Sequence, residues 1–297
     1  MIIGLMIYFL NRKTVTDFPA PSEVTQQGVN GTPPTNSSST TTDQATAPVD
    51  TTKTVIGTSV QNRAITAYHY GEGTNEVLFV AGVHGGYSWN TSLLAYGLMD
   101  YLKANPEMIP ATVKITIIPT LNPDGLFKVV GVEGTFSSAN VSKSTAVQVA
   151  GRFNANNVDL GRNFDCGWKS TGIWRTKEVL AGSSVFSEPE SLALKSYVET
   201  HKLASAVVWY SAAGGVYASA CDGDPSSATM KLTNVYAKAS GYPAHESFDF
   251  YETSGDVVNW LASKKIPAIS VLLTNHQDTE WSKNLAGVKA TLNNFAK

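Results

Sequence analysis

Short apolar runs that alternate with helical patterns, from Val60 to the end of the chain, constrain the fold more than any other feature of the sequence. Four of these runs have the length of a strand: 77–82, 113–118, 204–210 and 268–273. Strands that are apolar on both sides must be covered on both faces, as in parallel sheets flanked by helices. The pattern predicts a single α/β domain with a mixed, largely parallel central sheet, helices on both faces, and a site at the carboxyl ends of the strands.

Local signals place some of the remaining elements. The run Ser187-Glu188-Pro189-Glu190 has the form of a capping box, with Ser187 as the N-cap of a helix that reaches about Lys202. Asn122-Pro123-Asp124-Gly125 has turn composition. Further helices are expected from about Ser88 or Asn90, from Ser226 to Ser240, and over 280–295.

The N-terminal part has a different character. Residues 1–13 hold an apolar run about half the length of the roughly 20 residues that span a bilayer, and we expect the tail of a signal or membrane anchor. Residues 14–55 are rich in Thr, Ser and Pro and are expected to be a disordered tether, which leaves 56–297 as the folded domain. This layout favours an extracytoplasmic protein, secreted or membrane-anchored. A disordered N-terminus on a cytosolic protein is the alternative.

Composition excludes one class of partner and limits the cysteine chemistry. The net charge of the 297 residues is -2, which provides no basic field for nucleic acid. The two cysteines, Cys166 and Cys221, lack metal-binding spacing. Both are expected near the same end of the sheet, so we predict one disulfide, with two unrelated buried thiols as the alternative.

The stretch from Asn154 to Asp165 places polar residues among Val158, Leu160 and Phe164, the pattern of a partly buried loop that aims Arg162 into a cleft. It resembles the N-A-N-G-V-D-L-N-R-N-F signature of the zinc carboxypeptidases of the M14 class, whose arginine binds the free C-terminal carboxylate of a peptide. Four further motifs recur in family order, at 122–125, 186–190, 251–260 and 266–269. The resemblance covers roughly 55–297. It implies the carboxypeptidase fold, and it implies peptide or protein C-termini as partners, peptidoglycan peptides among them.

The same resemblance assigns four substrate-binding positions: Arg152, Arg162, Asn163 and Tyr251. Arg152 resembles the oxyanion-stabilising arginine, although an exposed loop charge is the alternative. Arg162 resembles the carboxylate-binding arginine, or else forms an ion pair with Asp159 or Asp165. Tyr251 resembles the mobile phenol that closes on the terminal residue, with core packing as the alternative.

The metal site of the family is not reproduced. His84 follows the strand 77–82 where the first zinc ligand is expected, but Ser88 stands where the family has a glutamate and Tyr210 where it has the second histidine. A serine and a phenol are poor zinc ligands at neutral pH. Another site made of His84, His276 and either Asp124 or Asp256 stays open, with His276 otherwise expected to stabilise a turn.

The general base is also replaced, since Leu272 occupies the position of the family's catalytic glutamate, and Gly161 replaces the asparagine before Arg162. A leucine cannot move a proton. The sequence therefore predicts a non-catalytic pseudo-peptidase that needs no cofactor and retains a cleft for C-terminal carboxylates. The alternatives are an active zinc carboxypeptidase with non-standard ligands, and a degenerate copy whose cleft is filled by Tyr210 and Leu272.

Overall fold

The computed structural model describes residues 52–296. The apolar segment 1–13 and nearly all of the tether 14–55 lie outside the described residues. The first strand, β1 (Lys53–Thr58), begins within the last three residues of the range assigned to the tether. Among the described residues, no helix is long and apolar enough to cross a membrane.

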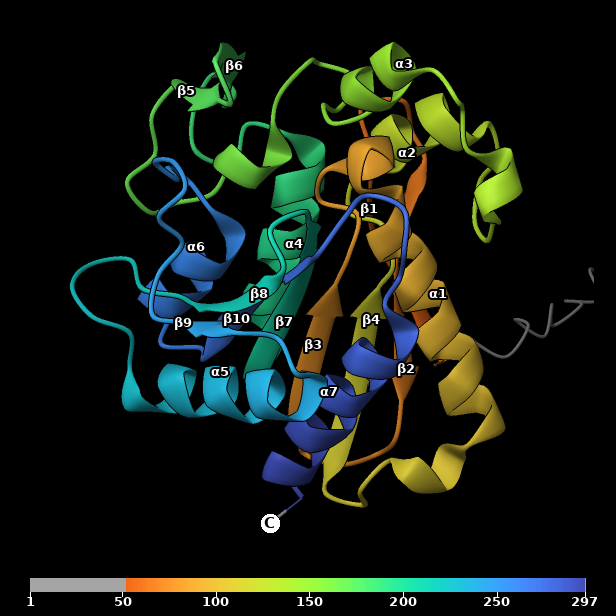
Figure 1. Cartoon of the computed structure of the whole chain (residues 1–297), viewed down its shortest axis with the longest axis vertical. Helices are drawn as coiled ribbons and strands as arrows, with labels where there is room; N and C mark the ends of the chain where they lie inside the picture. The colour runs from red at the N-terminus through yellow and green to blue at the C-terminus, as the bar shows by residue number, and fades with distance from the viewer. Residues whose placement is uncertain (1–51, 297) are drawn as a thin grey trace, which may run out of the picture. The chain divides into compact units, whose positions relative to one another are not determined.

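An eight-stranded sheet forms the centre of the domain, in the order β1-β2-β4-β3-β7-β10-β8-β9 (Figure 1). Its four central strands, β4, β3, β7 and β10, run parallel to one another. β2 and β8 join them in antiparallel orientation, β1 pairs antiparallel with β2, and β9 pairs in parallel with β8. The remaining bounds are β2 (Ala64–Tyr70), β3 (Asn75–Val80), β4 (Val113–Ile118), β7 (Leu203–Ser211), β8 (Gly215–Ala218), β9 (Ala244–His245) and β10 (Ala268–Leu273). A separate hairpin is formed by β5 (Thr171–Trp174) and β6 (Lys177–Leu180).

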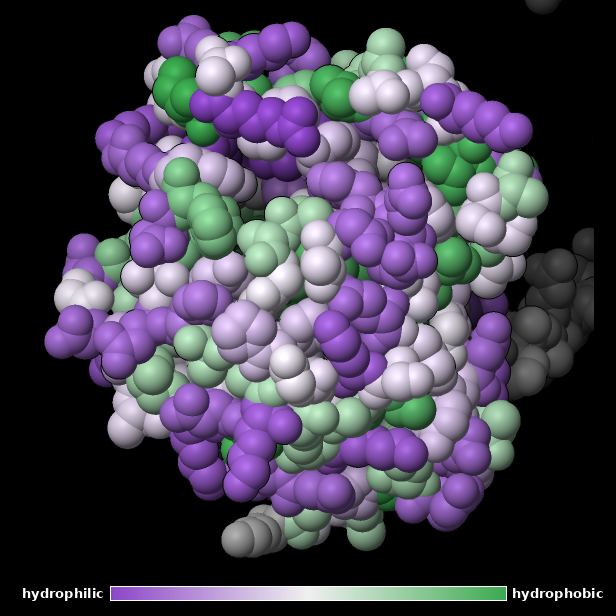
Figure 2. Space-filling view, in the orientation of Figure 1, coloured by the Kyte–Doolittle hydropathy of each residue, from purple (hydrophilic) through white to green (hydrophobic). Residues whose placement is uncertain are grey.

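Helices cover both faces of the sheet, which confirms the predicted fold class (Figure 1). One face packs against α4 (Pro189–Thr200) and α6 (Val257–Ser263), with Trp260 fully buried. The other packs against α1 (Trp89–Ala104), α5 (Ser227–Ser240) and α7 (Trp281–Asn294), with Trp209 fully buried. Two short helices, α2 (Pro123–Val130) and α3 (Thr145–Ala150), lie beside each other. Figure 2 shows a mainly hydrophilic face on which apolar side chains are scattered.

Two local predictions need correction. Helix α4 is capped by Glu188 and begins at Pro189, because proline with its fixed φ is favoured at the first helical position. Ser187 does not cap the helix and instead donates its hydroxyl to Glu188 Oε1 at 2.8 Å. Likewise, Asn122 is not part of an isolated turn but the N-cap of α2, and its side chain accepts from Gly125 N at 2.8 Å.

The two predicted cysteine partners are joined, since Cys166 and Cys221 form a disulfide with a Cα–Cα distance of 5.5 Å. It links the segment after the Arg162 loop to the loop that follows β8.

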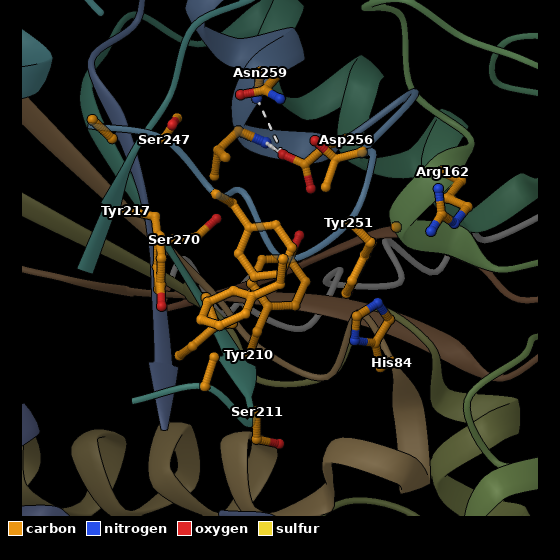
Figure 3. Close-up of a pocket in the computed structure, with 18 of the residues that line it drawn as sticks. His84, Arg162, Tyr210, Ser211, Tyr217, Ser247, Tyr251, Asp256, Asn259 and Ser270 are labelled. Carbon is orange, nitrogen blue, oxygen red and sulfur yellow. Dashed lines mark hydrogen bonds between the residues drawn. The ribbon is translucent and has the colours of Figure 1, made fainter. Parts of the chain in front are cut away.

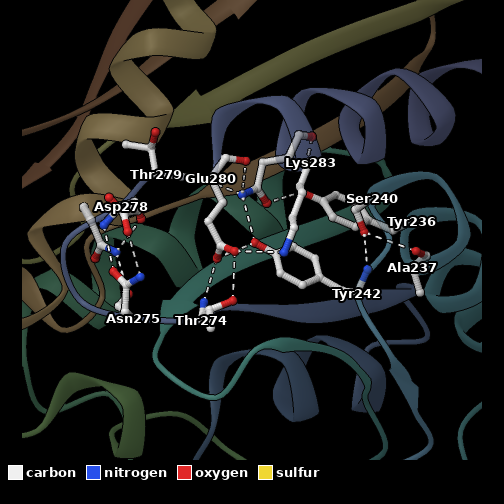
Figure 4. A network of polar contacts seen from close by, with 12 residues as sticks. Tyr236, Ala237, Ser240, Tyr242, Thr274, Asn275, Asp278, Thr279, Glu280 and Lys283 are labelled. Atoms are coloured by element: carbon white, nitrogen blue, oxygen red, sulfur yellow. Dashed lines mark hydrogen bonds and ion pairs between the residues drawn. The ribbon is translucent and has the colours of Figure 1, made fainter.

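A polar network holds the loop 274–280 between β10 and α7 (Figure 4). Glu280 accepts hydrogen bonds from Thr274 N at 2.7 Å, from the Tyr242 hydroxyl at 2.7 Å and from Lys283 Nζ at 3.0 Å. Asn90 on α1 donates to the carbonyl oxygens of residues 275 and 278. The network matters for the site because this loop carries His276.

Candidate functional site

A cavity of about 670 Å³ lies where β3, β7 and β10 end (Figure 3). β3 leads into His84, β7 ends in Tyr210 and Ser211, and β10 contributes Leu272 to the cavity lining. Parallel strands bring their carboxyl ends to one edge, so the sheet itself sets the position of these side chains.

His84 is buried at one side of the cavity and is neutral. Burial and the nearby Arg152 guanidinium lower its pKa well below the usual 6.5. Its Nε2 lies 3.6 Å from Asp159 Oδ1, beyond hydrogen-bonding distance. Its Nδ1 has no hydrogen-bond partner among the described residues. A Cβ on Gly161 would lie 2.9 Å from His84 Nε2, so the imidazole occupies space that a larger residue at 161 would need.

Asp159 is fully buried between two arginines. Arg152 donates from Nε and Nη2 to Asp159 Oδ2 at 3.1 and 2.8 Å, and Arg162 Nε lies 3.5 Å from the same oxygen. Burial raises the pKa of Asp159, but Arg152, His84 and Arg162 outweigh it and hold the pKa below 3.8. Two guanidiniums thus face one carboxylate and leave one net positive charge at the wall of the cavity.

The other groups of Arg162 fix two neighbouring segments. Its Nη2 donates to the carbonyl oxygen of Ile173 at 2.8 Å, and its Nη1 donates to that of Glu252 at 3.3 Å. The guanidinium carbon lies 5.7 Å from the centre of the Tyr251 ring. The guanidinium therefore places positive charge at the cavity and also connects the two segments that carry Ile173 and Glu252.

Five buried polar atoms near this wall lack hydrogen-bond partners within residues 52–296: His84 Nδ1, Ser88 Oγ, Asp159 Oδ1, Arg162 Nε and the hydroxyl of Tyr210. The Tyr210 ring centre lies 5.1 Å from that of His84. Burial raises the pKa of the Tyr210 phenol well above 10, so it stays protonated at neutral pH.

Asp256 is a cavity residue that the sequence did not single out as a principal site. It is the N-cap of α6, and its Oδ1 accepts from Val258 N at 3.0 Å and Asn259 N at 3.3 Å. Burial raises its pKa from 3.8 to about 6. A Ser-Gly-Asp run before a helical pattern is the signal that could have identified the cap, but not its exposure to a cavity.

The model of the zinc carboxypeptidase family, peptidase M14, matches residues 40–277. The chain belongs to this family. Mouse carboxypeptidase M is 30% identical over 159 residues, which are 49% of this chain and 30% of that protein. Bacteriocin BCN5 of Clostridium perfringens is 29% identical over 154 residues, which are 50% of this chain and 15% of that protein. The matched regions thus span less than a third of either relative.

Solved carboxypeptidase-like structures have the same fold. The carboxypeptidase A from Helicoverpa armigera matches with a TM-score of 0.65 at 17% identity, over 82% of this chain and 68% of its own. The murein-tripeptide amidase MpaA from Escherichia coli O157 matches with a TM-score of 0.56 at 19% identity, over 82% of this chain and 92% of its own.

The residues at the family's metal position do not fit a catalytic zinc ion. Such sites take three protein ligands from His, Cys, Asp or Glu. At the family's other two ligand positions stand the neutral hydroxyl of Ser88 and the phenol of Tyr210, which stays protonated at neutral pH. Asp159 Oδ1 also lies 3.6 Å from His84 Nε2, but this carboxylate is paired with Arg152 and Arg162. In the described part of the chain, no group of three or more His, Cys, Asp or Glu side chains is arranged to hold a metal ion. The combination of His84 and His276 with Asp124 is ruled out by position, because Asp124 bonds Ser59 and Arg63.

The structure brings most of the sequence-derived site residues together. His84, Arg152, Arg162 and Tyr251 all line the cavity. Asn163 does not: it is fully buried, and its Nδ2 donates to Ala181 O and Ser184 O, so it holds the chain before α4.

His276 also lines the cavity, beyond its expected role in a turn. Its Nδ1 lies 3.0 Å from Ser211 Oγ, and its ring centre lies 4.3 Å from that of Tyr87. Burial, then Arg175 and Arg152, lower its pKa to about 4, so this imidazole is neutral at pH 7.

Proposed function

We propose that this chain is a non-catalytic member of the zinc carboxypeptidase family that binds the C-terminal carboxylate of peptides. The observation that carries the proposal is the set of residues at the reacting centre. Leu272 replaces a base, and the hydroxyls of Ser88 and Tyr210 replace two metal ligands. None of the three can ligate zinc tightly or take a proton from water near pH 7.

The proposed binding of a carboxylate rests on the positive charges of the arginines that line the cavity. Arg152 and Arg162 share one buried carboxylate, and the exposed Arg175 adds a further positive charge to the cavity lining. A peptide carboxylate that reaches the wall formed by Arg152 and Arg162 meets net positive charge there, where interactions are weakly screened. Tyr251 stands beside Arg162 and supplies a phenol to the same ligand.

The proposed setting is extracytoplasmic. The Cys166–Cys221 disulfide supports an oxidising compartment. Peptidoglycan stem peptides are proposed as ligands alongside other peptide C-termini, because the structurally similar MpaA is named a murein-tripeptide amidase. Anchoring through the N-terminal segment is proposed on composition alone.

The alternative is an active carboxypeptidase with a recruited base. Asp256 favours it to a limited extent, because a carboxyl with a pKa of about 6 in a cavity is suited to general-base work. An active enzyme would also need a set of metal ligands around His84, which the described residues do not provide, so the non-catalytic function is preferred.

Two measurements on the folded domain test the proposal. The first tests for zinc binding and catalysis. It combines elemental analysis after purification in zinc-containing buffer with a zinc-supplemented peptidase assay. About one zinc per chain with chelator-sensitive release of C-terminal residues would overturn the proposal. Calorimetric titration with a peptide acid and its C-terminal amide tests recognition, and equal affinity for both would show that the carboxylate is not recognised.

A further inference from the structure

Four carboxylates gather on two loops at one end of the cavity. Strands β8 and β9 pair in parallel, so the loops that follow them leave the sheet at the same end. The two segments, 219–226 and 244–250, contain no lysine or arginine but hold four acidic residues: Asp222, Asp224, Glu246 and Asp249. Two of the acids, Asp224 and Glu246, line the cavity together with Phe248 and Phe250. We name the four acids and the two phenylalanines the acidic rim.

The carboxylates of the acidic rim lack counter-ions in the described part of the chain. All four residues are exposed, and none of them forms an ion pair with a basic side chain within residues 52–296. Charges of both signs are usually interspersed on a protein surface. A patch of one sign instead creates a field that attracts and orients a partner of the opposite sign.

The phenylalanines of the acidic rim add exposed aromatic surface to these charges. Phe250 is 62% exposed, and its ring centre lies 5.3 Å from that of Phe248 and 6.3 Å from that of Tyr217. Aromatic side chains are enriched at protein interfaces, and their faces attract ammonium and guanidinium groups. Carboxylates and rings on the same two loops therefore favour a ligand that is both cationic and able to pack its stems on the rings.

Tyr217 supplies a second, independent sign of a ligand at this end of the cavity. Its side chain is 1% exposed, and its hydroxyl has no hydrogen-bond partner among the described residues. Burial and the nearby Asp249 carboxylate raise the pKa of this phenol. In Figure 3, Tyr217 and Ser247 lie on the side of the pocket away from Arg162. A buried hydroxyl is costly to leave unsatisfied, and an N–H group of a bound partner would satisfy it.

We propose that the acidic rim is a docking surface for a cationic segment of a partner protein. Lysine or arginine side chains of that segment pair with the four carboxylates and pack on Phe248 and Phe250. Charge complementarity selects this occupant, because a neutral segment would leave the carboxylates without counter-ions and an acidic one would be repelled. The inference is independent of the proposed binding of C-terminal carboxylates at Arg152 and Arg162.

Two blocked peptides test the docking surface without a C-terminal carboxylate: acetyl-Lys-Phe-Lys-Lys-amide and acetyl-Gln-Phe-Gln-Gln-amide. Titration calorimetry at pH 7.5 should show that the lysine peptide binds about 10-fold or more tightly than the glutamine peptide at low salt. An increase from about 50 to about 500 mM NaCl should weaken the binding of the lysine peptide about fivefold or more, because exposed charges are screened. Equal affinity for the two peptides would overturn the inference. Spermine bound as tightly as the lysine peptide would also overturn it, because the rim would then attract any cation.

The triple variant Asp224→Asn/Glu246→Gln/Asp249→Asn tests the assignment to the rim. All three positions are exposed, so the fold should tolerate the changes. The lysine peptide should bind about 10-fold or more weakly to this variant than to the wild type.

A matched control variant, Glu72→Gln/Asp100→Asn/Glu107→Gln, removes the same number of exposed carboxylates from positions outside the cavity lining. It should change the affinity for the lysine peptide by less than about twofold. Equal losses of affinity in the two triple variants would show that net charge alone attracts the peptide and would refute a site at the rim.

The contribution of the rings is tested at Phe250, which is exposed and therefore open to substitution without loss of the fold. Phe250→Ser should weaken binding of the lysine peptide about threefold or more, whereas Phe250→Tyr, which keeps an aromatic face, should stay within about twofold of the wild type. The same affinity in the serine variant as in the wild type would contradict a docking surface built from carboxylates and rings together.

Discussion

Replacement of Asp256 by asparagine should stabilise the domain, and more so at pH 7.5 than at pH 4. Burial raises the pKa of this carboxyl from 3.8 to about 6 in the folded protein. Between these values the unfolded chain has lost the proton and the folded chain retains it, so a rise in pH favours unfolding. The resulting loss of unfolding free energy is absent well below pH 3.8 and reaches its full value above pH 6. Asparagine does not titrate, so the variant does not suffer this loss.

The magnitude follows from the same values. A difference of about two pKa units corresponds to about 3 kcal/mol of unfolding free energy. The pKa of about 6 already includes the favourable contacts with the backbone amides of α6, which lower it. Because Asp256 is partly exposed to the cavity, solvent screening reduces the gain. We expect a net stabilisation of about 1–2 kcal/mol at pH 7.5 and close to none at pH 4.

The assay is urea unfolding of the wild type and of Asp256→Asn at both pH values, with the disulfide kept intact. Contributions from other carboxyl groups are common to both proteins and cancel in the difference. The control Asp224→Asn should change the free energy of unfolding by less than about 0.5 kcal/mol at either pH, as for other exposed positions. A pH-independent difference, or destabilisation by the asparagine at pH 7.5, would refute the reasoning.

Further predictions concern the disulfide, the lost metal site and the loop that carries His276. The double variant Cys166→Ala/Cys221→Ala should lose about 4 kcal/mol in urea unfolding, because the bridge closes a loop with a sequence separation of 55; unchanged stability would contradict this. The double variant Ser88→Glu/Tyr210→His should bind about one zinc per chain by elemental analysis, because it adds two ligands to His84 and so restores a set of three. No gain over wild type would show that these positions do not converge. Glu280→Ala should lower the free energy of thermal unfolding by about 2–3 kcal/mol, because it removes the carboxylate that accepts several hydrogen bonds in Figure 4. A decrease below about 0.5 kcal/mol would show that water replaces the carboxylate as acceptor.

The sequence predicted the central strands well and the edges poorly. The ranges 113–118 and 268–273 agree with the structure residue for residue, because a strand buried on both faces has an unbroken apolar run. Strand β9 (Ala244–His245) has two residues and no such pattern. Helix α4 starts two residues after the predicted cap, because the preference of Pro189 for the first helical position outweighs the capping box.

For the site, motif order placed side chains near the cavity but did not fix where each one points. His84, Arg162 and Tyr251 line the cavity as their motif positions predicted. Asn163 is adjacent to Arg162 in sequence and yet faces the interior, because loop direction decides which neighbour is exposed. Asp256 carries a capping signal only, and its access to the cavity depends on packing between segments distant in sequence.

The shape of the cavity argues against simple decay of an enzyme. A site released from selection is free to gain stability by filling its void with well-packed apolar side chains and by losing unpaired buried polar groups. Tyr210 and Leu272 are large enough to do so, but a cavity of about 670 Å³ remains open beside them. Within residues 52–296, the Asp256 carboxylate at its wall has no counter-ion and the Tyr210 hydroxyl has no hydrogen-bond partner, and both cost folding free energy. Features that destabilise the empty domain in this way are best explained by a bound ligand that satisfies them, so retained binding accounts for the site better than loss of all function.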